Sequence, residues 1–371
     1  MAIDVRPVQT AAEVTAFIDL PARIYRDDLH WVPLPHRELK KRLDRKTHPF
    51  FEHGQAEFFV ARRDGCAVGR IAAIKNDLHT ATHHDDVGFF GFFECVDDPD
   101  VADALFAAAA GWLRSRGLRA LRGPMSYSTN EECGLLIDGF NSAPVLMMAY
   151  NPPYYARLIE GFGFRKAKDL FAYEATDTVF PERALRLLEL AKRELNVTIR
   201  PFVRRFHRRE CAIMRDLFHS AWAGNWGFVP MTDRETDQLA SDLMRIGDPD
   251  LVRIAEVDGT PVGFILVLPD WNQALRLARG SRSPFHLLKT LWYARTIDTA
   301  RVLAFGVRAD HRFEGIDIML CHDAYAAGIR KGYRRVEMSW VLENNVVLNQ
   351  ALHKIGARLY KRYRLYDLSL T

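Results

Sequence analysis

Cysteine is scarce and irregularly placed in this sequence. The five cysteines of the 371-residue chain are odd in number, lie far apart and form no Cys-x-x-Cys pair. A disulfide framework needs an even set of cysteines, and a zinc site needs ligands at short, regular spacing. We therefore expect neither, and the distribution suits a reducing cytoplasm.

The sequence also has no segment that is typical of membrane insertion or export. No apolar run approaches the roughly 18 residues that a membrane span needs, and the N-terminal stretch MAIDVRPVQTAAEV has no apolar core of a signal peptide. The net charge of +4 is only mildly basic, so no nucleic-acid partner is expected. These absences predict a cytoplasmic protein.

Histidine clusters only once, at His79, His83 and His84, next to Asp85 and Asp86. A metal site needs fixed geometry and supporting contacts, whereas this stretch is typical of a polar loop after a strand. We expect no metal.

An internal repeat organises the chain. FFVARRDGCAVGRIAAI at 58–74 parallels VRIAEVDGTPVGFILVL at 252–268, 194 residues further on. Each segment places two β-rich runs around an Asp-Gly pair, which predicts a hairpin. The length of 371 residues likewise fits two domains of ordinary size.

Two further matches define the lobes and their insertions. GFRKAKDLFAYE at 163–174 parallels GARLYKRYRLYD at 356–367, and GLRALR at 117–122 parallels GYRRVE at 332–337. The changed offset places one insertion near 126–150 and another near 271–298. We predict lobes at 1–176 and 199–371, joined by a bridging helix over 177–198. Alternating strands and helices predict α/β domains with mixed central sheets flanked by helices.

The segment 301–341 carries the clearest chemical signal. A β-rich run ends at Val307, a short loop contains Arg312, Gly315 and Asp317, and a helix follows. Unpaired backbone amides and the helix dipole at such a helix start can hold a phosphate, and glycine allows the ligand to approach the backbone.

This loop resembles the [Q/R]-x-x-G-x-[G/A] pyrophosphate loop of GNAT acyltransferases, and Asn345 lies eleven residues before Gly356, as in that superfamily. The resemblance implies tandem GNAT-like domains and acyl-CoA as a substrate. It implies cofactor-binding residues along the strand end, the loop and beyond: Phe305, Gly306, Val307, Arg312, Phe313, Glu314, Gly315, Ile316, Asp317 and Asn345.

Two positions depart from the GNAT pattern. Asp317 replaces a small residue and brings a carboxylate near the expected phosphate, and Leu352 stands where many members carry the tyrosine that protonates the thiolate. In the first lobe, FFECVDDPDVADALF at 92–106 has acids in place of the glycine loop. That lobe is therefore expected to be a degenerate partner.

The chain is also similar to a bacterial family of two-lobed GNAT proteins that includes putative ceramide synthases. The shared segments are GPMSYSTNEECGLLIDGF, YNPPYY, PDWNQAL and SWVLENN. The similarity implies N-acyl transfer from acyl-CoA to an amine, in particular a sphingoid-type lipid amine. Two alternatives stay open: an aminoacyl-tRNA-dependent peptidyl transferase of tandem-GNAT type, and a non-catalytic acyl-CoA or lipid-binding module.

The two insertions suggest further roles. Segment 271–298 interleaves Lys and Arg with Leu and Trp, which is typical of an interfacial helix at an anionic membrane, a lid over an acyl chain, or a helix packed on its own domain. Peripheral contact with the inner membrane is the sharper expectation.

The insertion at 126–150 offers carboxylates for catalysis, because an ammonium must lose a proton before it attacks a thioester. Glu131 and Glu132 are the first candidates and Glu343 is the third; either of the first two can instead cap a turn or face solvent. Tyr127 and Asn130 supply further polar groups in the same segment. The rest of this insertion predicts an apolar strand pair that turns at Asp138-Gly139.

Overall fold

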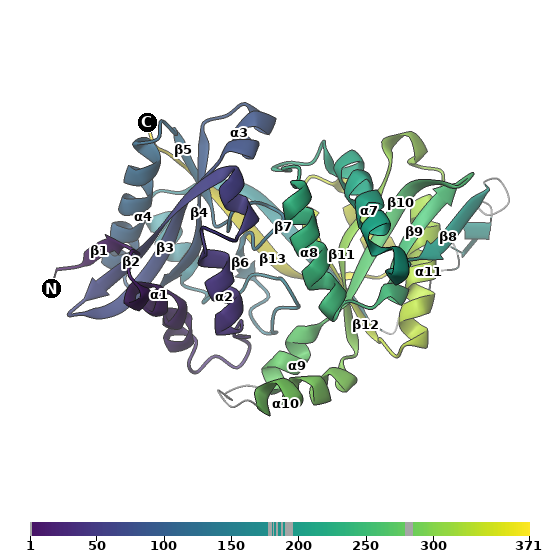
Figure 1. The fold of residues 1–371 in the computed structure, drawn as a ribbon, viewed down its shortest axis with the longest axis horizontal. Coiled ribbons are helices and arrows are strands. Elements are labelled where there is room, and N and C mark those ends of the chain that lie inside the picture. Colours follow the sequence, from purple (N-terminus) through teal and green to yellow (C-terminus); the bar gives the residue numbers. More distant parts are fainter. Residues whose placement is uncertain are drawn as a thin grey trace. The chain divides into compact units, whose positions relative to one another are not determined.

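A computed structural model describes residues 2–371 except 177–179, 181, 183–184, 187, 190–195 and 279–284. Its contacts divide the chain into two compact units (Figure 1). Unit 1 comprises residues 1–170 together with 361–371, and unit 2 comprises residues 171–360. The expected bridging helix over 177–198 falls largely outside the described residues.

Unit 1 is a mixed sheet with helices on both faces. Its strands run in the order β1-β2-β3-β4-β5-β13, with β6 paired to β13, and β4 and β5 are parallel. Its elements are β1 (Asp4–Pro7), α1 (Ala11–Ile24), α2 (His36–Leu43), β2 (Gly54–Arg63), β3 (Cys66–Asn76), α3 (Asp77–His83), β4 (Val87–Cys95), α4 (Pro99–Arg114), β5 (Ala120–Gly123), β6 (Leu135–Asp138), α5 (Tyr155–Gly161), the start of β7 (Arg165–Thr176) and the end of β13 (Arg358–Ser369).

Alternation along the strands assigns the two helices to opposite faces of this sheet. Phe59 of β2 belongs to the core cluster that α4 covers with Leu105 and Phe106. The next residue back, Phe58, meets Phe17 of α1 with ring centroids 5.5 Å apart. Because successive strand side chains point to opposite faces, α1 and α4 enclose the sheet between them.

Unit 2 repeats this plan. Its strands run in the order β7-β12-β11-β10-β9-β8, with β11 and β12 parallel. Its elements are the end of β7, β8 (Val197–Pro201), α7 (His207–Trp222), α8 (Asp233–Ile246), β9 (Val252–Val257), β10 (Thr260–Pro269), α9 (Trp271–Leu277), α10 (Phe285–Tyr293), β11 (Thr299–Val307), α11 (Ile316–Arg330), β12 (Arg335–Leu342), α12 (Val346–Lys354) and the start of β13. Helix α11 packs on the core of β9, β10 and β11 through Ile316 and Leu320.

The repeated hairpins share their register as well as their sequence. Gly69 pairs with Ala61 in unit 1, and Gly263 pairs with Ala255 in unit 2. Both hairpins have a register shift next to these pairs, and both turn through an Asp-Gly pair with positive φ at each residue. Two copies of one hairpin, 194 residues apart, therefore have the same local geometry.

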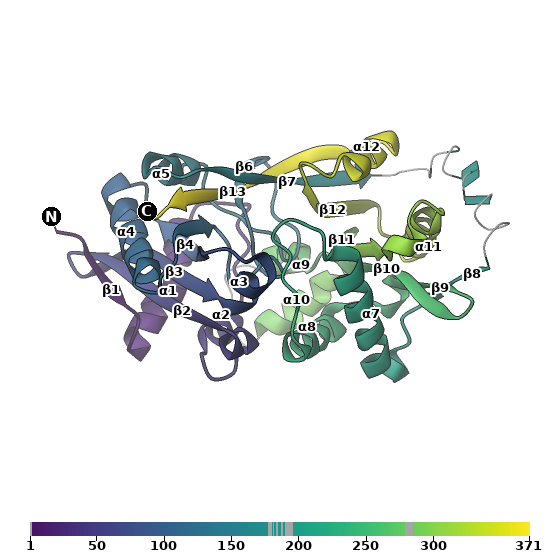
Figure 2. The same ribbon diagram turned by 90° about the horizontal axis from the view of Figure 1, so that it is seen from above.

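The unit boundaries differ from the predicted lobes because two strands pass from one unit to the other. Strand β7 starts in unit 1 and ends in unit 2, whereas β13 starts in unit 2 and ends in unit 1. In Figure 2 the yellow end of β13 accordingly lies among elements of unit 1. There Tyr366 pairs with Gly123 of β5, and the Arg364 guanidinium donates to the Asp169 carboxylate at 2.7 Å.

Of the two strands predicted within 126–150, only the first is present. Residues Leu135–Asp138 do form β6, but β6 pairs with Arg362–Arg364 of β13, and no strand follows Gly139 up to residue 150. The buried Lys361 ammonium donates to the carbonyls of Gly139 and Ser142. These carbonyls are thus satisfied by a side chain from the far end of the chain instead of a second strand.

Candidate functional site

Strands β11 and β12 of unit 2 separate halfway along their length. They are paired only from Thr299 to Val302, while β11 continues to Val307. The register of β11 with β10 shifts at this same point, between Leu266 and Val267. Such a bulge bends a strand, so the predicted segment Phe305–Val307 pairs with β10 alone among the described strands.

Two features fix the end of β11. The Trp222 indole donates to the carbonyl of Phe305 at 3.2 Å, so this carbonyl already has a partner. At Gly306 a Cβ would lie 2.7 Å from the Cβ of Ala221, and only glycine allows α7 to pack this closely. The strand end is thereby held firmly against α7.

The loop from Arg308 to Gly315 leads directly into α11. Gly315 precedes the helix at φ +86°, and no side chain caps the helix start. Ile316, the first helical residue, is fully buried in the core of unit 2. The start of α11 is therefore anchored in the core by Ile316, and a helix start without an N-cap side chain leaves amides that suit an anion.

The predicted loop residues take different positions. Arg312 reaches back to the carbonyl of Ala221 at 2.9 Å, and His311 pairs with Glu314 at 2.9 Å. Phe313 has φ +68° and is 90% exposed. The Asp317 carboxylate, which departs from the GNAT pattern, accepts the amide of the next residue, Ile318, at 2.9 Å within the first turn of the helix.

In unit 1 the segment that follows β5 occupies the corresponding place beside the end of β4. Strands β4 and β5 are paired only from Val87 to Phe89, and the segment after β5 then continues along β4. The Met125 amide donates to the Phe90 carbonyl at 2.7 Å, and the Phe92 amide donates to the Ser126 hydroxyl at 3.4 Å. A Cβ at Gly91 would lie 2.4 Å from the Met125 carbonyl oxygen, so the contact is tight.

A buried polar network closes the end of β4. Tyr25 and Tyr155 donate to one oxygen of the Glu94 carboxylate at 2.9 Å and 2.7 Å, and Arg70 lies 3.5 Å from the other. Burial raises the pKa of Glu94 to about 7, against the lowering effect of Arg70. In the register of the hairpins Glu94 pairs with Arg70 as Gly306 pairs with Phe264, so unit 1 has a carboxylate where unit 2 has a glycine.

The four predicted catalytic residues of unit 1 occupy one loop but have different surroundings. Glu131 lies 3.4 Å from the Nε2 atom of His48, and Glu132 lies 3.8 Å from Arg42. The backbone amide of Asn130 donates to the Ser128 hydroxyl. Tyr127 is buried, has φ +77° and donates its hydroxyl to the carbonyl of Arg42, so its ring holds the loop together.

The predicted residues after β12 have structural contacts in unit 2. The Asn345 side chain caps α12 by accepting the amide of Leu348 at 3.2 Å. Glu343 is partly exposed, and its carbonyl lies 3.5 Å from the Asn349 amide group. Leu352 is buried in an apolar cluster with Tyr173 and Val341, so this position offers no proton to a thiolate.

Sequence reasoning missed three buried groups. These are Glu94 with its tyrosines, His48 beside Glu131, and the pair Arg301–Glu337, in which the Arg301 Nε atom and a Glu337 oxygen are 3.5 Å apart. Burial raises the pKa of Glu337 to about 7, opposed by the charge of Arg301. An acid within an apolar run such as VGFFGFFEC was the available signal for Glu94; His48 carried none.

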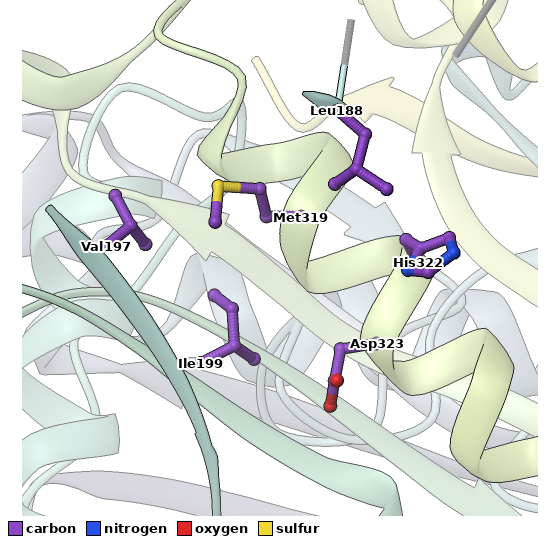
Figure 3. A pocket seen from close by; sticks show the side chains of 6 residues that line it. All are labelled: Leu188, Val197, Ile199, Met319, His322 and Asp323. Atoms are coloured by element: carbon purple, nitrogen blue, oxygen red, sulfur yellow. The ribbon is translucent and has the colours of Figure 1, made fainter. Parts of the chain in front are cut away.

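A pocket of about 370 Å³ lies along α11 (Figure 3). It is lined by Leu188, Val197, Ile199, Met319, His322 and Asp323. Asp323 already pairs with Arg253, so the pocket offers apolar volume more than a reactive centre.

Within the described ranges no group of three or more His, Cys, Asp or Glu side chains could hold a metal ion. His79 instead pairs with Asp85 at 3.1 Å, and burial lowers the pKa of His79 to about 4.

Comparison with known proteins places the chain beside two full-length relatives. It is 38% identical to Protein YghO of Escherichia coli K12 over 98% of this chain and 94% of that protein. It is 36% identical to a protein of Caulobacter vibrioides named bacterial ceramide synthase over 99% of this chain and 98% of that protein. A search of family models gave no match.

Solved structures show the same fold at low sequence identity. A tandem GNAT protein from the clavulanic acid biosynthesis pathway has a TM-score of 0.58 at 13% identity, covering 100% of this chain and 99% of its own. A GCN5-related N-acetyltransferase from Sphaerobacter thermophilus has a TM-score of 0.53 at 15% identity, covering 99% and 96%.

Proposed function

Since the chain belongs to the GNAT acyltransferase superfamily, and within it to the two-lobed family of the Caulobacter relative, we propose that it transfers an acyl group from acyl-CoA to an amine. The acceptor that we propose is a sphingoid-type lipid amine, and the acyl chain is long. The name of the Caulobacter relative, bacterial ceramide synthase, supports this choice of substrates.

The observation that carries the proposal is the uncapped start of α11 after Gly315. The pyrophosphate of CoA carries negative charge, and the backbone amides at the start of α11, together with the helix dipole, would provide a complementary site. The separation of β11 from β12 leaves the backbone of Gly306 and Val307 beside this loop. An extended pantetheine arm would pair there, and a backbone amide would polarise the thioester carbonyl.

The reaction needs two proton transfers, one to the CoA thiolate and one from the acceptor ammonium. Because Leu352 is buried in an apolar cluster, the CoA thiolate takes its proton from the reacting nitrogen or from solvent. The acceptor ammonium needs a carboxylate that reaches solvent, and Glu131 in unit 1, with 27% of its side chain exposed, meets this requirement.

The test is product analysis by mass spectrometry. The purified protein is incubated with palmitoyl-CoA and a panel of amines that includes sphinganine. A new N-palmitoyl amide with release of free CoA supports the proposal. CoA binding without any amide would favour the binding module, and activity that disappears on RNase treatment would favour the peptidyl transferase.

We further propose that segment 271–298 contacts an anionic membrane surface, so that a cytoplasmic protein meets its lipid substrate there. Three apolar residues of α10, Leu288, Leu291 and Trp292, are 62%, 50% and 66% exposed, and Lys289 among them is exposed as well. The three apolar residues are spaced at i, i+3 and i+4, one helical face. The Arg295 guanidinium lies 5.4 Å from the Trp292 ring centroid, and a basic, aromatic face of this kind suits an anionic interface. No helix in the described parts of the chain is long and apolar enough to cross a membrane.

A further inference from the structure

A run of basic side chains lies on the surface of unit 2, between β8 and the first turn of α7. All residues from Val203 to Arg209, here called the basic segment, are exposed. Most of them carry basic side chains: Arg204, Arg205, His207, Arg208 and Arg209. The remaining two are apolar, and Phe206 is 53% and Val203 37% exposed. The proposed acyl transfer leaves this segment without a role.

The positive charge of the basic segment is not neutralised. Its arginines form no ion pair with any residue that the structure describes. The neighbouring acid, Glu210, is buried and accepts from Arg200 at 2.6 Å, and Asp242 of α8 pairs with Arg245. The start of α7 has no side-chain cap, so the positive end of its dipole adds to the same field. A surface that repels itself in this way lowers stability and points to an anionic partner.

The basic segment lies close to the insertion that carries α10. The Arg204 guanidinium donates to the carbonyl of Met244 at 3.5 Å, and the Trp271 indole at the start of α9 donates to the carbonyl of Ile246 at 2.8 Å. Both carbonyls belong to the last turn of α8. The end of α8 therefore joins the basic segment to α9, and α9 packs against α10.

We propose that the basic segment binds the phosphate groups of anionic phospholipids at a membrane surface, close to the contact proposed for α10. Guanidinium groups pair with phosphate oxygens, and apolar side chains between arginines enter the boundary between headgroups and acyl chains. The Arg205 guanidinium lies 5.7 Å from the Phe206 ring centroid, which keeps charge and ring together at that boundary. This inference rests on the membrane contact proposed above for segment 271–298 and names the lipid chemistry that it recognises.

Single-stranded RNA would also attract these arginines, but two observations favour lipid. The net charge of the whole chain is only +4, whereas a nucleic-acid-binding domain usually has a strongly basic face. Exposed apolar side chains accompany the charge both here and on α10, and they gain by leaving water for lipid: Phe206, Leu288, Leu291 and Trp292. The lipid amine of the proposed reaction is itself a membrane component.

The experiment measures co-sedimentation with vesicles of phosphatidylglycerol and phosphatidylcholine, and with vesicles of phosphatidylcholine alone. The double variant Arg208→Gln/Arg209→Gln should bind the anionic vesicles about 30-fold more weakly, because each arginine near such a surface contributes about 5-fold. The control is Arg6→Gln/Arg119→Gln, which removes the same charge from exposed arginines of unit 1 that pair with acids. Its binding should change by less than about 3-fold, and unchanged thermal unfolding shows that both variants are folded.

Three results would overturn the proposal. If Arg208→Gln/Arg209→Gln binds as the wild type does, or loses no more than the control, the basic segment is refuted, while a loss in Leu288→Glu still supports the contact through α10. If the wild type binds neither kind of vesicle, both membrane contacts are refuted and acyl transfer is judged by its own product analysis. If the wild type binds an oligouridylate RNA more tightly than the anionic vesicles, and the double variant loses that binding, the basic segment is a nucleic-acid site.

Discussion

Strand β4 of unit 1 and β11 of unit 2 have the same register with the hairpin before them but end in different surroundings. Gly69 pairs with Cys95 in unit 1, and Gly263 pairs with Val307 in unit 2. Beyond its parallel partner, β4 is covered by residues 125–126 of its own chain, whereas β11 leads into the uncapped start of α11. One fold thus supports either a strand end covered by its own chain or one that leads into a helix start without a side-chain cap, and the residues after the strand decide between them.

The difference shows that the hairpin framework does not itself provide the site. Unit 1 has Glu94 with its two tyrosines at the position where unit 2 has Gly306. After β4, Asp98 caps α4 and accepts the amides of Asp100 and Val101. Two amides at the helix start of unit 1 are thus bonded to the carboxylate of the N-cap residue, whereas the N-cap residue of α11 is a glycine without a side chain.

The largest expected effect concerns the open helix start. Gly315→Trp should weaken CoA binding by about 100-fold or more, because two hydrogen bonds to a charged group, each worth about 1.5 kcal/mol or more, are lost. Titration calorimetry with CoA measures the change. Gly332→Trp is the control, since Gly332 also has positive φ but lies in open space after the other end of α11; equal losses in both variants would contradict the assignment of the loop.

The buried carboxyl of unit 1 should make stability depend on pH. The pKa of Glu94 is raised from 4.5 to about 7 by burial, so the folded state holds a proton that the unfolded chain releases. The resulting stability, up to about 3 kcal/mol, is fully present below about pH 4.5 and is lost as the pH rises through about 7. Urea unfolding at pH 5 and 8 should show a smaller decrease for Glu94→Gln than for the wild type, and identical decreases would refute the assignment.

The tight contact of β4 with residues 125–126 should be sensitive to one methyl group. Gly91→Ala should lower the free energy of unfolding by about 1–3 kcal/mol, because the new Cβ would lie 2.4 Å from the Met125 oxygen. Gly111→Ala, on an open face of α4, should instead stabilise by about 0.5–1 kcal/mol. Thermal unfolding of both variants gives the result, and a neutral Gly91→Ala would show that the strand end is not closed.

The smallest effect concerns the surface of unit 2. Leu288→Glu should reduce binding to vesicles of phosphatidylglycerol and phosphatidylcholine by about 10-fold, since an apolar contact is replaced by a charge that anionic lipid repels. Leu29→Glu in unit 1 is the matched control, because Leu29 is 75% exposed and lies outside segment 271–298. Co-sedimentation measures both, and equal binding of wild type and Leu288→Glu would exclude this face as the membrane contact.

Much of this architecture could be predicted from the residue pattern. The Asp-Gly pairs and the alternating runs around them predicted both hairpins, because turn chemistry and period-two alternation are local properties. The loop with Gly315 was likewise expected to lead into a helix, and α11 begins at Ile316. The second strand expected after Asp138 is absent. The carbonyl of Gly139 accepts a hydrogen bond from Lys361, which lies 222 positions further along the chain, and a local pattern does not show such a contact.

The sequence by itself determined the duplicated α/β plan, the hairpins and the loop–helix unit that suits a phosphate, because each depends on neighbours in the chain. Only the tertiary structure decided three contacts. Strand β13 completes the sheet of unit 1, Tyr25 and Tyr155 donate hydrogen bonds to Glu94, and His48 lies 3.4 Å from Glu131. Each of these contacts joins residues at least 61 positions apart, and a buried polar group finds its partner in space, where burial makes an unpaired group costly.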